Sequence, residues 1–149
     1  MVFAPDGQSL WIGAPGRQRV VEPGAIYRFD PASGRRIQPP IPSAAPVVRL
    51  AVTPDGRYLV GALAGLHPDD RGGEADADRT RKWRTASIVV WEAETGRPLR
   101  TVAVNAESDY ATATEWPDTY LSVSPDGKSV TAWVELGANR FEEIGRAHV

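Results

Sequence analysis

Short apolar runs alternate with turn signals along the whole chain, and this pattern predicts strands rather than helices. In the middle of the chain, residues 47–53 and 58–64 flank one tight-turn signal, and residues 87–92 and 98–104 flank another. Runs of five to seven residues bounded by glycine and proline are typical of strands, and tight turns join such strands as antiparallel neighbours. Residues 47–104 are therefore predicted to form four antiparallel strands.

The same turn signal occurs three times. It is the tripeptide Pro-Asp-Gly at residues 5–7, 54–56 and 125–127, and each copy has an apolar residue two positions before it and another three positions after it. Proline presets φ, aspartate caps the turn with its side chain, and glycine accepts positive φ. The turn aspartates lie 49 and 71 residues apart, and the second interval shortens to 51 without the polar stretch 65–84. This spacing indicates an internal repeat.

A four-stranded unit of roughly 40–50 residues is the repeat length of a β-propeller blade. We therefore predict an all-β fold of four-stranded antiparallel blades, with about one full and two partial blades. The expected units are a partial blade and connector (1–46), a complete blade (47–104) with an insertion at 65–84, and a connector with a partial blade (105–143). The first unit would hold later strands of a blade, including 9–13, 25–30 and 35–37, followed by a proline-rich connector at 38–46.

The chain resembles WD-repeat β-propellers of the bacterial type. The three Pro-Asp-Gly turns carry the resemblance, together with Phe29-Asp30 before Ser33-Gly34 and Trp91-Glu92 before Thr95-Gly96, which stand where such blades have Trp-Asp and Thr-Gly. The sequence of residues 33–41 resembles that of blades fused to bacterial serine/threonine protein kinases. The Gly-His pair that usually precedes the first strand is absent. The resemblance implies a scaffold or sensor module that binds protein partners.

A closed propeller ring needs about four to eight blades, so we expect this chain to be a piece of a longer protein and its remaining blades to be partners. Its open blade edges are expected to self-associate. Residues 144–149 do not continue the blade pattern, and their codons can spell part of a common sequencing adapter. We therefore expect a non-native tail at 144–149.

Composition narrows the classes of function. The chain is 42% hydrophobic and 24% charged, with a net charge of -2, which is globular and gives no general attraction to nucleic acid. No apolar run approaches the roughly 20 residues of a membrane span. There are no cysteines and only two histidines, His67 and His148, so neither a metal site nor a cofactor site is expected. A cytoplasmic location is expected, with a secreted or periplasmic protein as the alternative.

Strand order places both kinds of tight turn at one end of a blade and the long connectors 14–24, 38–46, 65–84 and 105–118 at the other. The candidate partner-binding residues in these connectors are Trp83, Arg84, Tyr110 and Trp116. For Trp83 and Arg84 the alternative is that they belong to a solvated insertion with no binding role. For Tyr110 and Trp116 the alternative is that they cover the core between blades.

No catalytic residues are identified, because a serine nucleophile needs a base and His67 lies alone in the insertion. The expected function is a non-enzymatic scaffold or sensor module for a protein or peptide partner, in a bacterial signalling protein or kinase. The alternative is a fragment of an enzymatic propeller, such as a quinoprotein-like dehydrogenase or a peptidase-associated propeller.

Overall fold

The computed structural model describes residues 1–14, 23–66, 83–103, 119–135 and 141–148. Within these ranges the chain forms eleven strands and no helix, which confirms the all-β fold class. The described residues accordingly contain no helix long and apolar enough to cross a membrane.

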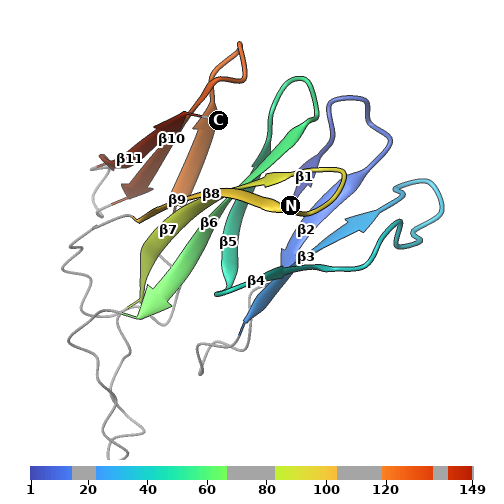
Figure 1. Cartoon of the computed structure of the whole chain (residues 1–149), viewed down its shortest axis with the longest axis horizontal. Coiled ribbons are helices and arrows are strands. Elements are labelled where there is room, and N and C mark those ends of the chain that lie inside the picture. Colours follow the sequence, from blue (N-terminus) through green and yellow to red (C-terminus); the bar gives the residue numbers. More distant parts are fainter. Residues whose placement is uncertain (15–22, 67–82, 104–118, 136–140, 149) are drawn as a thin grey trace, which may run out of the picture.

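The strands form three antiparallel sheets that lie side by side (Figure 1). The first sheet has the order β1 (Val2–Phe3), β2 (Leu10–Ala14), β3 (Gly24–Phe29) and β4 (Ile41–Ser43). The second has the order β5 (Val47–Val52), β6 (Tyr58–Leu66), β7 (Trp83–Glu92) and β8 (Pro98–Ala103). In the third, β10 (Ser129–Glu135) lies between β9 (Thr119–Val123) and β11 (Phe141–His148). Neighbours in the chain are neighbours in the sheet, which is the up-and-down arrangement of a propeller blade.

The second sheet is the middle layer, and its two faces belong to different cores. One face meets the first sheet in a cluster of Trp11, Ile26, Ile41, Val47, Leu59, Leu63, Val89, Trp91 and Ala93. The other face meets the third sheet in a cluster of Val60, Ile88, Val90, Val130 and Ala132. Successive strand residues point to opposite faces, so adjacent residues such as Leu59 and Val60 serve the two cores. Burial on both faces explains the continuous apolar runs at residues 59–63 of β6 and 88–91 of β7.

The first sheet differs from the sequence prediction in its last strand. The segment 38–46 was expected to be a connector, but β4 lies within it, and Ile41 pairs with Ile26 of β3. The predicted strand at 35–37 is reduced to an isolated bridge between Phe29 and Arg36. Pro42 is tolerated because β4 is at the edge of the sheet, where a strand needs hydrogen-bond donors on one side only. With β1 two residues long and β4 three, this sheet is a shortened blade.

Two other segments pair further than the sequence predicted. In the second sheet, Leu66 pairs with Trp83 and Gly65 with Arg84, so the strands extend into both ends of the predicted insertion 65–84. In the third sheet, β11 pairs with β10 as far as His148, so residues 144–148 continue that sheet. The non-native origin predicted for 144–149 concerns the coding sequence and stays a prediction.

Candidate functional site

The three Pro-Asp-Gly turns stack beside one another at one end of the sheets. Their glycines Gly7, Gly56 and Gly127 have φ values of 70°, 73° and 69°, in the left-handed region that glycine adopts without strain. A Cβ placed on Gly56 would lie 3.8 Å from Cδ of Pro5, and one on Gly127 would lie 3.6 Å from Cδ of Pro54. Pro5 and Pro54 therefore each cover the glycine of the next turn.

Every turn aspartate caps its own turn, and two of the three also bind a hydroxyl group. The Oδ1 atoms of Asp6, Asp55 and Asp126 accept hydrogen bonds from the backbone N–H groups of Gln8, Arg57 and Lys128, at 2.9, 3.1 and 3.0 Å. The same Oδ1 atoms of Asp55 and Asp126 accept from the hydroxyl groups of Thr53 and Ser124, at 2.6 and 2.5 Å. These hydroxyl bonds, and then the backbone bonds, hold the pKa values of Asp55 and Asp126 below the ordinary range. The first turn has Ala4 at the hydroxyl position, so Asp6 has one donor fewer.

The acidic residue of each Trp-Asp-like dipeptide caps the second kind of turn. Ser33 donates its hydroxyl to Oδ2 of Asp30 at 2.6 Å, and Thr95 donates to Oε2 of Glu92 at the same distance. The Ser33 bond is the main reason that the pKa of Asp30 is lowered. These residues therefore have a structural role in closing the hairpins.

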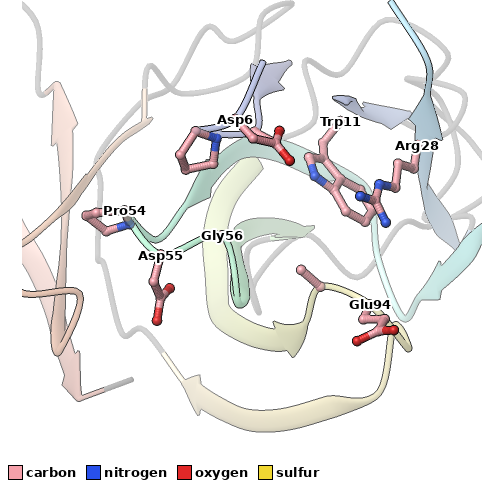
Figure 2. Close-up of a pocket in the computed structure, with 10 residues that line it drawn as sticks. Asp6, Trp11, Arg28, Pro54, Asp55, Gly56 and Glu94 are labelled. Carbon is pink, nitrogen blue, oxygen red and sulfur yellow. The ribbon is translucent and has the colours of Figure 1, made fainter. Parts of the chain in front are cut away.

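A cleft of about 560 Å³ opens between the first and second sheets at the end where the tight turns lie (Figure 2). Both sheets line it, through residues Ala4, Pro5, Asp6, Trp11, Arg28, Pro54, Asp55, Gly56, Ala93 and Glu94. Figure 2 shows the Asp6 carboxylate on the Trp11 side of the cleft, and the Asp55 carboxylate directed away from Trp11. The cleft thus brings together residues from five separate stretches of the chain.

The cleft contains a stacked cation. Arg28 lies over the Trp11 ring, with its guanidinium carbon 5.0 Å from the ring centroid, and its Nη2 donates to Oγ of Ser9 at 2.9 Å. Trp11 is 1% exposed and Ser9 is fully buried. The Nε atom of Arg28 is also buried and has no hydrogen-bond partner among the described residues. A cation with incompletely satisfied donors therefore lies at this sheet interface.

The carboxylates of the cleft do not neutralise this cation. Among the described residues, Asp6 makes its one side-chain hydrogen bond with Gln8, and Glu94 makes neither a side-chain hydrogen bond nor an ion pair. Arg28 likewise forms no ion pair with a described carboxylate. Asp55 is occupied by its own turn and lies 3.9 Å from Nε of Arg57. Within the described part of the chain, the Asp6 and Glu94 carboxylates therefore form no ion pair, and Arg28 has one nitrogen, Nε, without a hydrogen-bond partner.

The residues predicted to bind a partner lie elsewhere or outside the described ranges. Trp83 and Arg84 begin β7, at the end of the second sheet opposite to the tight turns, where their backbones pair with Leu66 and Gly65. Tyr110 and Trp116 lie outside the described residues, so their proposed role stays a prediction. Sequence reasoning missed the cleft. Aligning the repeats would have signalled it, because Arg28 stands where the second unit has Val90.

No family model and no curated protein matches the chain. Solved structures similar to it include an oligogalacturonate lyase in complex with manganese, at 15% identity and TM-score 0.59, with 99% of this chain and 34% of that chain covered. Hydrazine synthase of Kuenenia stuttgartiensis has 16% identity and TM-score 0.51, with 89% and 38% covered. The WD40 repeats of RRP9 have 20% identity and TM-score 0.46, with 96% and 37% covered.

The chain spans little more than a third of the length of these solved structures. The first two likenesses and the four-stranded antiparallel sheets together give the fold of incomplete β-propeller blades. Likeness at this level of identity concerns the fold alone.

Proposed function

We propose that the chain is a non-enzymatic part of a propeller that acts as a scaffold or sensor for a protein or peptide partner. One observation carries the proposal: the tight turns gather at one end of three packed sheets, and the ends of the strands that lead into the long connectors lie at the other. Loops presented on a rigid scaffold are the usual place for binding residues. The proposed contacts at this connector end are Trp83, Arg84, Tyr110 and Trp116.

The biological setting is part of the same proposal. The resemblance of residues 33–41 to kinase-fused blades supports a bacterial signalling protein or kinase as the parent, with the remaining blades as structural partners. A net charge of -2 supports a protein or peptide ligand rather than nucleic acid. We place the protein in the cytoplasm and assign it no cofactor.

An enzymatic propeller is the second candidate. Two of the similar solved structures are enzymes by name, the oligogalacturonate lyase and hydrazine synthase, with TM-scores of 0.59 and 0.51, and this likeness favours the second candidate. Their likeness to this chain lies in the fold. A catalytic domain or cofactor site in the parent reading frame would favour this candidate.

Selection of peptide ligands tests the proposal. Peptides selected from a displayed library on the whole chain would be measured by calorimetry against Trp83→Ala/Arg84→Ala, with Lys128→Ala at the tight-turn end as the control. We expect the double variant to weaken binding by about tenfold or more, as substitution of buried aromatic and arginine anchors does. Selected peptides that bind the double variant and the parent chain equally would contradict a docking role for the connector end.

A further inference from the structure

We propose that two copies of this chain associate head to tail and close a ring of six blades. The outer face of the first sheet of each copy packs against the outer face of the third sheet of the other copy. The inference goes beyond the proposed function, because the partner is a second copy of the chain, in the place that the remaining blades hold in a longer parent. It rests on the equivalence between these two outer faces and the faces that are buried inside the chain.

The outer face of the first sheet is apolar. Trp11 and Ile26 belong to the core shared with the second sheet, so the residues that alternate with them point away from that core. These outward residues form cross-strand pairs: Phe3 with Leu10, Leu10 with Phe29, and Ile12 with Tyr27. The Tyr27 and Phe29 rings lie 6.3 Å apart, and Phe3 is 58% exposed. Among the described residues, neither core cluster includes any member of this patch.

The same kind of face is buried in the second sheet. Leu10 and Leu59 each lie three residues after a turn glycine. Phe29 and Trp91 each directly precede an acidic cap. Leu59 and Trp91 are 0% and 2% exposed, because the first sheet covers them. The outer face of the first sheet therefore has the composition of a surface that another sheet covers.

The outer face of the third sheet carries two large aromatic residues. Val130 and Ala132 pack against the second sheet, so Thr131 and Trp133 point to the opposite side. Trp133 pairs with Tyr120 of β9, and these residues are 36% and 44% exposed. Aromatic side chains of this size are the usual anchors of protein interfaces.

The outer face of the third sheet is equivalent to the inner face of the first. Thr131 lies five residues after its turn aspartate, as Trp11 does, and Trp133 lies on the same side of β10 as Thr131. Trp11 is 1% exposed because the second sheet covers it. Each internal interface joins one face of each kind, and the two ends of the row of sheets leave one of each kind open (Figure 1). A contact between these faces of different copies therefore continues the internal interfaces.

The number of blades selects two copies. The described part of each chain forms three sheets, and closed propellers have about four to eight blades. Two copies supply twice three sheets, which lies within this range, whereas three copies exceed it. A head-to-tail contact gives a closed ring or an open filament, depending on the rotation between copies. Only the closed pair buries both outer faces of every copy.

Sedimentation equilibrium of the whole chain tests the assembly. We expect one species at twice the chain mass of 16.1 kDa, with no larger species as the concentration rises. A monomer, a trimer, or a mass that keeps growing with concentration overturns the proposal. Tyr27→Lys and Trp133→Glu, on the two outer faces, should each raise the dissociation constant of the dimer about tenfold or more. Leu99→Lys is the matched control, since Leu99 is 42% exposed on β8 of the middle sheet and should leave the dimer unchanged.

Mixing two variants separates the head-to-tail contact from a symmetric one. In a mixed dimer of Tyr27→Lys and Trp133→Glu, one contact is that of the parent chain and the other brings opposite charges together. We therefore expect the equimolar mixture to form dimers about tenfold more tightly than either variant alone. Phe3→Lys, at a side chain 58% exposed on the edge strand β1, repeats the test with a change that the fold tolerates. No gain on mixing in either pair, or a dimer that Trp133→Glu leaves intact, overturns the proposal.

Discussion

Gly61 is the position where one methyl group most directly tests the packing of the middle sheet. The Trp91 indole lies against the backbone of β6 at this glycine. An added Cβ would lie 2.8 Å from Cζ3 and 3.1 Å from Cη2 of Trp91, and 3.3 Å from Cδ2 of Leu50. Trp91 is 2% exposed and belongs to the core shared with the first sheet, so it has no solvent to move into. Gly61→Ala must therefore displace packed atoms.

Two opposing terms set the size of the effect. Alanine in a strand interior is favoured over glycine by roughly 0.5–1 kcal/mol through chain entropy. Overpacking a well-filled core costs about 1–3 kcal/mol. We expect Gly61→Ala to lower the free energy of unfolding by about 1–2 kcal/mol, which for a chain of this size corresponds to a Tm lower by about 2–8 °C.

Urea unfolding followed by near-ultraviolet circular dichroism measures this change, because the signal reports the loss of packed aromatic side chains on unfolding. A double-mutant cycle with Trp91→Phe supplies the control: the smaller ring makes room, so the cost of Gly61→Ala should fall by about 1 kcal/mol in that background. The packing described for Trp91 would be refuted if Gly61→Ala were as stable as the parent chain. It would also be refuted if the losses of stability in Gly61→Ala and Trp91→Phe simply added in the double variant.

Two further predictions concern the turns and the outer face of the third sheet. Thr53→Ala should destabilise the chain by about 1–2 kcal/mol at neutral pH, because the buried hydroxyl bonds both the Asp55 carboxylate and the Tyr58 N–H. The folded-state pKa of Asp55 is lowered, so the stabilisation that its carboxylate contributes is present above the ordinary pKa and is lost as pH falls from about 4 toward 2. Urea titrations of the parent chain and Thr53→Ala should therefore give a smaller difference in the free energy of unfolding at pH 2.5 than at pH 7. An equal difference at the two pH values would contradict the assigned Asp55 bond. Trp133 on β10 is 36% exposed and should contribute to self-association through the open blade face. Sedimentation should therefore show a smaller weight-average mass for Trp133→Lys than for the parent chain. A parent chain that is monomeric at all concentrations would contradict this prediction.

Local sequence signals predicted most of the fold because each strand pair is closed by its own turn residues. The Pro-Asp-Gly turns place their glycines near φ +70°, and the bounds predicted for the four strands of 47–104 agree with β5–β8 except at the ends of the insertion. The prediction failed at β4, where proline content was taken to exclude a strand. An edge strand tolerates Pro42 because only one of its sides is hydrogen-bonded, and edge position is a property of the assembled sheet.

The cleft was not predictable from local pattern for a related reason. Its charged groups come from the first turn, from β3 and from the turn after β7, and only the packing of two sheets brings them together. Arg28 also fits the alternation of a half-buried strand, so periodicity alone gives it no special role. The predicted partner residues could be chosen because they lie in long connectors. The structure places Trp83 and Arg84 at the start of β7, at the end of the sheet opposite to the tight turns.

The repeated turn is an internal control that separates structural residues from the others. Where copies agree, as in the glycine with positive φ and the aspartate that caps its own backbone, the hairpin itself requires the residue. Where the first copy differs, the hairpin is formed all the same: Ala4 N–H still donates to Ser9 O at 2.8 Å without a hydroxyl at this position. Two of the positions at which the first copy differs from the second, Ala4 for a hydroxyl residue and Arg28 for valine, line one cleft. The hairpin requires neither departure, and among the described residues Arg28 keeps a buried Nε without a hydrogen-bond partner.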